Sequence, residues 1–225
     1  MEIIFEDNHL IAINKLPGDI SQGDKTGDEP LVEKVKQYLK ESYQKPGNVY
    51  VGLVHRIDRP VSGVILFAKT SKAGERLSQM IQQRELQKTY WAVVKNKPAN
   101  ESGTLHHFLL KNEFQNKSYA HDKQIKNSKE AILNYRLISA IDKYYLLEVE
   151  PKTGRHHQIR VQLASMGCPI KGDIKYGFNR TNPDGSIHLH ARKLHFIHPV
   201  KKEPVTIMAN PPKDPVWDAF MKTME

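Results

Sequence analysis

Short apolar runs separated by polar turns recur along this chain, and they predict more strands than helices. Runs rich in β-branched and aromatic residues occupy residues 3–5, 10–14, 64–68, 87–94, 131–138 and 144–149. In the run at residues 87–94, alternation places Tyr90 on one face of a strand and Trp91 on the other. The last two runs are separated by the turn Asp142-Lys143 and predict an antiparallel pair.

Apolar residues at three- and four-residue spacing predict three helices. The first follows Asp28, which we expect to cap it, with a proline in the first turn. The second begins at Ser71 as its cap, and the third runs from near His156 to Gly167. Their apolar faces comprise Val32, Val35 and Leu39; Leu77, Met80 and Ile81; and Ile159, Leu163 and Met166. Several hairpins combined with a few helices favour an α+β fold.

One stretch, residues 112–129, is polar and rich in lysine and has no apolar period. It is either a solvated charged run or a mobile hairpin or loop that becomes ordered when a partner binds. Elsewhere the chain has no internal repeat and no linker-like stretch. We therefore expect a single domain over residues 1–225.

Composition narrows the class of protein. The net charge of +9, from 34 basic and 25 acidic residues, points to a polyanionic partner, although a merely basic soluble protein also fits. A hydrophobic content of 39% argues against global disorder. The single cysteine, Cys168, excludes an internal disulfide framework and a thiolate metal cluster. The acidic N-terminus and the lack of a long apolar run predict a cytoplasmic protein without a signal peptide or membrane span.

The most charged stretch of the chain leads directly into its most apolar run. Asp58 lies between Arg56 and Arg59, just before the strand predicted at residues 64–68. Opposite charges within a few ångströms lower the pKa of a carboxylate, so we expect Asp58 to stay ionised. An ionised carboxylate at the edge of a sheet suits nucleophilic or electrostatic catalysis. The alternative is a surface salt bridge, worth about 0–1 kcal/mol.

A second charged stretch surrounds the third predicted helix. Arg160 lies one residue from the apolar face of that helix, so its guanidinium can lean along the edge of the core. Arginine there can bind a carboxylate through a planar two-point contact that lysine cannot reproduce. We expect that carboxylate to be Asp58.

These stretches resemble the motifs of the RluA family of RNA pseudouridine synthases. In chain order they read N-K-L-P-G from residue 14, H-R-I-D-R-P-V-S-G from 55, K-T-Y-W-A-V-V from 88, T-G-R-H-H-Q-I-R-V-Q from 153, G-C-P-I-K-G-D from 167 and H-A-R-K-L-H-F-I-H-P from 190. The resemblance covers residues 14 to about 212. The chain departs from the family pattern at an inserted Leu16, at Ile57, at Val61 in place of threonine, and at Gln162 in place of histidine.

The resemblance implies a pseudouridine synthase fold, which is α+β, with a mixed, largely antiparallel central sheet, flanking helices and a catalytic cleft. Because the motifs begin at Asn14, we expect no N-terminal S4 RNA-binding domain. The implied enzyme isomerises specific uridines of structured ribosomal or transfer RNA to pseudouridine, with ribosomal RNA the first expectation. It needs no cofactor, because substrate and product are isomers. We expect a monomer.

By the same resemblance, Asp58 is the catalytic residue that attacks the sugar or triggers glycosidic cleavage. Tyr90 stacks on the uracil or transfers a proton, and Arg160 pairs with Asp58. The residues expected to contact RNA are Arg56, Arg59, Lys15, Arg155, His157 and Lys171. Arg56 is expected to displace the target nucleotide or hold its phosphate.

Three other interpretations remain open at this stage. A hydrolase that releases the base also acts at an anomeric carbon, but it usually needs a second acid, and none lies near Asp58 in sequence. A non-catalytic RNA-binding module would explain the charge but not a buried Asp58. His188 and His190 would share a strand face, but no acidic residue stands beside them at ligand spacing, so we expect no metal site.

Overall fold

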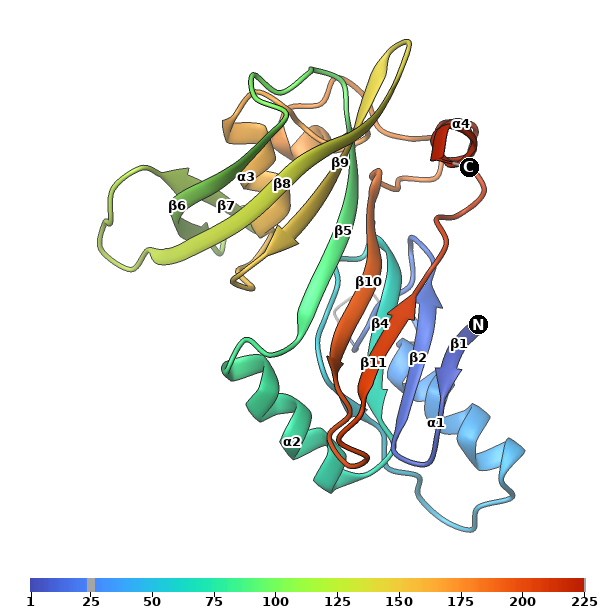
Figure 1. Cartoon of the computed structure of the whole chain (residues 1–225). Helices are drawn as coiled ribbons and strands as arrows, with labels where there is room; N and C mark the ends of the chain where they lie inside the picture. Colours follow the sequence, from blue (N-terminus) through green and yellow to red (C-terminus); the bar gives the residue numbers. More distant parts are fainter. Residues whose placement is uncertain (24–26, 225) are drawn as a thin grey trace. The chain divides into compact units, whose positions relative to one another are not determined.

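The computed structural model describes residues 1–23 and 27–224, and it confirms an α+β fold with a mixed, mostly antiparallel sheet of eleven strands (Figure 1). The strands are β1 (Glu2–Glu6), β2 (Leu10–Lys15), β3 (Gly52–Leu53), β4 (Ser62–Ala68), β5 (Gln87–Val94), β6 (Ser102–Asn112), β7 (Lys117–His121), β8 (Lys129–Ile141), β9 (Tyr144–Pro151), β10 (Leu189–Ile197) and β11 (Pro204–Met208). The helices are α1 (Leu31–Ser42), α2 (Ser71–Gln82), α3 (Gln158–Ser165) and α4 (Pro215–Met224), with a single 3-10 turn, η1 (Ile174–Tyr176).

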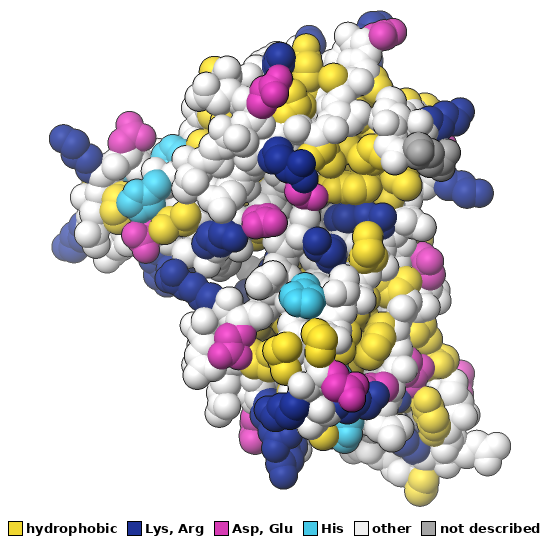
Figure 2. Space-filling view, in the orientation of Figure 1, with side chains coloured by type: hydrophobic (Ala, Val, Ile, Leu, Met, Phe, Trp, Pro, Cys, Tyr) yellow, Lys and Arg dark blue, Asp and Glu magenta, His cyan; other side chains and the backbone are white. Residues whose placement is uncertain are grey.

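The chain divides into two compact units. Unit 1 comprises Met1–Gln87 and Ala191–Asn210, and unit 2 comprises Lys88–His190 and Pro211–Glu225. The single domain expected from the sequence stays a prediction. No helix in the described part of the chain is long and apolar enough to cross a membrane. Lys and Arg side chains are prominent on the face drawn in Figure 2, as a net charge of +9 leads one to expect.

Unit 1 is built on strands β2 and β4, which pair antiparallel and are buried along their whole length. Alternate residues of these strands pack on α2 on one side and on α1 on the other. A strand covered on both faces needs apolar residues at every position, which explains the continuous run after the charged stretch. The charged stretch is thereby attached to a fully buried strand pair of unit 1.

Two predicted helix caps in unit 1 are wrong. The residue that precedes α1 is Pro30, which offers no side-chain bond to the helix, and the Asp28 carboxylate instead pairs with the Arg59 guanidinium. The cap of α2 is Thr70 rather than Ser71, with the Thr70 hydroxyl accepting the Ala73 N–H at 3.3 Å. Both helices nevertheless bury the predicted faces, with Val35 and Leu77 at 0% exposure. Val32 and Ile81 lie at the margins of those faces and are only partly buried.

Unit 2 contains the antiparallel strand order β5-β9-β8-β6-β7. Part of the polar stretch at residues 112–129 forms β7, which the sequence pattern did not predict as a strand. The inward-facing residues of β7 are Ser118 and Ala120, so its alternation carries no strong apolar signal. β7 pairs antiparallel with β6 in a hairpin, whereas the expectation that this stretch is mobile and becomes ordered when a partner binds stays a prediction.

The helices of unit 2 also differ from the pattern. Six successive residues of α3, from Gln158 to Leu163, are buried, so the predicted one-sided apolar face is wrong. The helix is enclosed because it packs against β6, β7 and η1 together. At the end of the chain, α4 was not predicted, and its Trp217 and Phe220 pack on Trp91 of β5.

Candidate active site

The Asp58 turn, residues 58–61, lies in unit 1 and leads directly into β4. The Asp58 carbonyl accepts the Val61 N–H at 3.0 Å and closes the turn, while Asp58 itself is half-buried. Gly63, with φ at +112°, passes so close to Ala191 that a Cβ would lie 2.3 Å from its carbonyl oxygen. Only glycine fits this approach. The turn is therefore fixed where it joins the strand.

The predicted RNA contact Lys15 is instead a support for the Asp58 turn. Its side chain is fully buried, and its ammonium donates to the carbonyls of Leu16 at 3.0 Å, Arg59 at 3.0 Å and Val61 at 2.6 Å. Burial lowers the Lys15 pKa to about 8, although the carboxylates of Asp19 and Asp58 act in the opposite direction. An RNA-binding role for Lys15 is wrong in this arrangement, because no part of its side chain faces solvent. The N-K-L-P-G motif carried no sign of this, since it gives residue types and not side-chain depth.

The backbone of Val61, the residue that stands where the family pattern has threonine, is hydrogen-bonded on both sides. Val61 is 2% exposed, and both its N–H and its carbonyl are bound, to Asp58 and Lys15 respectively. At the start of the charged stretch, buried His55 accepts the Leu66 N–H on Nε2 at 3.2 Å. The turn is therefore held from both ends with valine at this position.

Arg56 and Arg59 lie on the surface of unit 1. Both are exposed, and Arg59 pairs with Asp28. An exposed guanidinium can donate two hydrogen bonds to phosphate oxygens. Their expected contacts with RNA stay predictions.

In unit 2, Arg160 makes the two-point contact that the sequence led us to expect, with a partner that we did not predict. Its Nε donates to Asp173 Oδ2 at 2.7 Å and its Nη2 to Asp173 Oδ1 at 2.9 Å, and both side chains are buried. The guanidinium carbon lies 5.1 Å from the centre of the Tyr176 ring. Asp173 is the last residue of the G-C-P-I-K-G-D motif. Its place in that motif was the only feature of the sequence that marked Asp173 as a candidate partner. The pair of Arg160 with Asp58 stays a prediction.

Two histidines stand at the start of α3. The rings of His156 and His157 stack at 3.7 Å, and His157 holds a left-handed backbone with φ at 53°. Burial, and then the nearby charge of Arg160, lower the pKa of His157 to about 2. His157 is therefore neutral, and Nδ1 lies 2.9 Å from the Tyr176 hydroxyl, which is placed to donate to it. A neutral ring carries no charge to attract a phosphate, and the predicted contact of His157 with RNA stays a prediction.

Tyr90 lies within β5, opposite Val149 of β9, and is 9% exposed. It shares a strand face with Ala92 and Val94, as the alternation predicted. Its roles in stacking on uracil and in proton transfer stay predictions.

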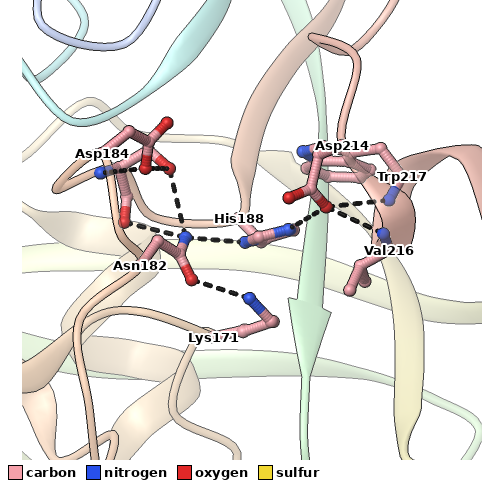
Figure 3. Close-up of polar contacts among 8 residues, drawn as sticks. Lys171, Asn182, Asp184, His188, Asp214, Val216 and Trp217 are labelled. Atoms are coloured by element: carbon pink, nitrogen blue, oxygen red, sulfur yellow. Dashed lines mark hydrogen bonds and ion pairs between the residues drawn. The ribbon is translucent and has the colours of Figure 1, made fainter.

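Lys171 belongs to a chain of polar contacts that Figure 3 shows from end to end. Its ammonium donates to Asn182 Oδ1 at 2.7 Å, and Asn182 Nδ2 donates to His188 Nδ1 at 2.9 Å. His188 Nε2 then donates to Asp214, which also caps α4 by accepting the N–H of Val216. Burial lowers the Lys171 pKa, yet the side chain stays partly exposed.

Arg155 is also partly exposed and donates from Nε to the Glu130 carbonyl at 2.8 Å. Contacts of Lys171 and Arg155 with RNA stay predictions.

The histidines have structural partners. His188 stacks on Trp217 at 5.3 Å, and His190 contacts the edge of the same ring at 6.0 Å, so both lie on one side of the chain as predicted. Burial lowers the pKa of His188, which favours the neutral ring. Among the described residues, no group of three or more His, Cys, Asp or Glu side chains could hold a metal ion.

A shallow groove of about 380 Å3 lies on unit 2, lined by Ser102, Gly103, Thr104, Asn134, Tyr135, Arg136, Glu148 and Glu150. Its two carboxylates are engaged, Glu148 with Arg136 at 2.8 Å and Glu150 with Lys152 at 3.1 Å. A groove whose basic side chains are already paired with its own carboxylates does not suit a polyanionic ligand. The charged motifs therefore hold the better candidate site.

Comparisons with known proteins agree with the motifs. A family model described as RNA pseudouridylate synthase matches residues 9–165. The chain is 30% identical over 239 residues to tRNA pseudouridine synthase C of Vibrio cholerae, covering 98% of this chain and 94% of that protein. It is 32% identical over 218 residues to the uncharacterized RNA pseudouridine synthase YhcT of Bacillus subtilis, covering 95% and 70%. Among solved structures, human RNA Pseudouridylate Synthase Domain Containing 4 has the same fold, with a TM-score of 0.80 at 22% identity and coverage of 97% and 92%.

Proposed function

The chain belongs to the RNA pseudouridylate synthase family, and we propose that Asp58, Tyr90 and Arg160 form its active site. The observation that carries this proposal is the construction of the Asp58 turn. A fully buried lysine holds the backbone carbonyls of Arg59 and Val61, and Gly63 fixes the join to β4. A surface loop that made only a salt bridge would not need a buried charge beneath it.

The reaction converts uridine in RNA into its isomer pseudouridine. The bond between uracil N1 and ribose C1′ breaks, the base turns, and a new bond joins C5 to C1′. The proton lost from C5 is balanced by the proton gained at N1. Asp58 is the group that attacks C1′ or triggers the cleavage, and an ionised carboxylate suits both roles. Tyr90 receives the C5 proton or stacks on the base while it turns.

Arg160 contributes a fixed positive charge. Its two-point contact with buried Asp173 and its position over the Tyr176 ring leave the guanidinium little freedom. A fixed guanidinium costs no reorganisation when charge develops in the transition state. We propose that it orients the Asp58 carboxylate and stabilises that charge.

We propose transfer RNA as the first substrate to test, where the sequence alone favoured ribosomal RNA. Proteins about 30% identical to this chain carry the name tRNA pseudouridine synthase C. The uridine must leave its stack to reach Asp58, at a cost of a few kcal/mol. Exposed Arg56 and Arg59 are proposed to offset that cost through phosphate contacts.

Mapping pseudouridine in total RNA from cells with and without the gene tests this proposal. Loss of pseudouridine at defined uridines of transfer RNA, restored by the wild-type gene but not by a D58N variant, is the expected result. A change confined to ribosomal RNA would move the substrate to that class. If no uridine changes in either class, the proposed function fails.

A further inference from the structure

The turn between β6 and β7 carries the most exposed large hydrophobic side chain that the structure describes. Phe114 is 99% exposed, whereas the next, Ile174, is 56% exposed. Single exposed apolar residues are common on proteins, but a whole aromatic ring in water is not. Such a ring is a candidate for contact with a partner.

The turn that presents Phe114 is built rather than loose. Asn112 Oδ1 accepts the Gln115 N–H at 3.0 Å, and the Asn116 N–H bonds to the Glu113 carbonyl at 3.3 Å. Asn116 then holds a left-handed backbone, with φ at 45°. Because these bonds fix the turn, the ring of Phe114 points outward by construction.

Two groups from another part of unit 2 anchor this turn. His156 Nε2 lies 3.1 Å from Asn116 Oδ1, and the Lys175 ammonium donates to the Asn116 carbonyl at 3.1 Å. His156 stacks on His157, whose Nδ1 lies 2.9 Å from the Tyr176 hydroxyl, and Lys175 precedes Tyr176 in the chain. The Tyr176 ring is 5.3 Å from the Lys117 ammonium and 5.1 Å from the Arg160 guanidinium. The hairpin is thus continuous with the surroundings of Arg160, which we propose to be catalytic.

The surroundings of Phe114 combine positive charge with a second ring. The lysines of the hairpin and its anchor are Lys111, Lys117 and Lys175, and Lys123 and Lys126 follow in the segment between β7 and β8. Tyr119 is 40% exposed, with the Lys117 ammonium 5.5 Å from its ring. Figure 2 shows Lys and Arg side chains projecting around the corner of the molecule where Figure 1 draws β6 and β7. Basic side chains interleaved with exposed aromatic rings are the pattern of surfaces that bind unpaired nucleotides.

We propose that the β6–β7 hairpin docks the substrate RNA and that Phe114 stacks on one of its unpaired bases. This inference rests on the proposed function for its choice of RNA as partner. Charge decides between RNA and a second copy of this chain, because two basic hairpins would repel each other. The hairpin is thereby a second contact with the RNA, separate from the uridine that reacts.

Replacement of Phe114 by tryptophan gives a direct readout. The natural Trp91 and Trp217 are 8% and 3% exposed, so the introduced indole of F114W dominates the solvent-sensitive emission. Titration with unmodified transfer RNA transcripts should quench this emission, because stacking on a base places the indole against a π-face. Unchanged emission at saturating RNA would overturn the proposal.

Binding measurements on matched variants separate stacking from burial of apolar surface. F114A and F114L should each weaken binding about tenfold, whereas F114W should bind like the wild type. The salt dependence of binding should stay the same in all three, because no phosphate contact is removed. Wild-type affinity of F114A and F114L would contradict the proposal.

Two controls separate RNA docking from self-association of the protein and from failure of the proposed function. Sedimentation of wild type and F114A should match; a dimer that F114A dissociates would make the hairpin an interface between copies and refute RNA docking. Pseudouridine formation by the wild-type enzyme is scored in the same samples. Quenching of F114W without any isomerisation would sink the proposed function and leave the docking surface intact.

Discussion

At the scale of single residues, the chemistry is assigned to side chains whose surroundings differ sharply. Asp58 is half-buried on a fixed turn, Arg160 is buried and paired with the Asp173 carboxylate, and Arg56 is exposed. These surroundings suit three different tasks: reaction, orientation and contact with the nucleic acid. Substitutions that keep size while removing one property test each assignment.

Replacement of Asp58 by asparagine should reduce isomerisation to background while the protein folds and binds RNA as before. Asparagine keeps the volume but cannot attack C1′ or carry the negative charge. Pseudouridine formation on a transfer RNA transcript measures the first effect, and thermal unfolding and RNA affinity measure the others. Turnover by D58N at a rate near that of the wild type would remove Asp58 from its role.

Replacement of Arg160 by lysine should leave the fold in place and remove most of the activity. Lysine keeps the charge beside Asp173 but cannot make two parallel bonds to its oxygens. We expect kcat to fall by at least about tenfold with a smaller change in KM, since the contact orients rather than binds. D173N is the matched variant, because it weakens the same contact from the other side. Full activity in both would show that the two-point contact is not needed.

At the scale of elements, the Asp58 turn depends on β2 as much as on its own sequence. Lys15 is the last residue of β2, and it holds the turn that precedes β4. The bond to the Val61 carbonyl is buried, so removing the ammonium takes the donor from a buried acceptor, at a cost of about 1–3 kcal/mol. The two strands and the turn therefore act as one structural piece.

The pH dependence of stability should reveal this lysine. Burial lowers the Lys15 pKa from 10.5 to about 8, so between these values the unfolded chain binds a proton that the folded protein has released. Stability therefore rises with pH through this window, by about 1.4 kcal/mol per unit, and levels off above pH 10.5. Below pH 8 Lys15 is protonated in both the folded and the unfolded protein, so its titration adds no pH dependence to the stability.

A K15M variant is the control for that measurement. It should be less stable than the wild type, and the rise between pH 8 and 10.5 that comes from Lys15 should be missing. Chemical unfolding at several pH values gives the difference between the two proteins, in which the other titrating groups cancel. A difference that does not change with pH would contradict the buried position of Lys15.

At the scale of the whole molecule, the net charge of +9 points to binding through phosphates. The logarithm of the association constant for transfer RNA should fall with the logarithm of salt concentration with a slope of about −3 or steeper. Replacing Lys117 by glutamine should make that slope shallower by about 0.7–0.9. Titrations between low and high salt measure both. A slope near zero would exclude a phosphate-dominated interface.

The local sequence determined the elements and the candidate residues. Apolar runs located six of the eleven strands, namely β1, β2, β4, β5, β8 and β9. The signal is clearest in β4, because a strand covered on both faces must be apolar throughout. The motifs located Asp58, Tyr90 and Arg160, because those residue types at that spacing are rare together. The exceptions are informative: β7 was missed because its inward residues are Ser118 and Ala120, too small and polar to mark a period.

Only the tertiary structure decided what the charged residues touch. A lysine in a sequence looks exposed by default, yet Lys15 is buried because β2 lies between β1 and β4 and the Asp58 turn closes over its end. Arg160 binds Asp173, thirteen positions further along, because the G-C-P-I-K-G-D box returns beside α3. Contacts of this kind depend on side-chain depth and on the return path of the chain. Neither leaves a periodic trace in the sequence, so composition and spacing determine the kind of chemistry and the fold determines its partners.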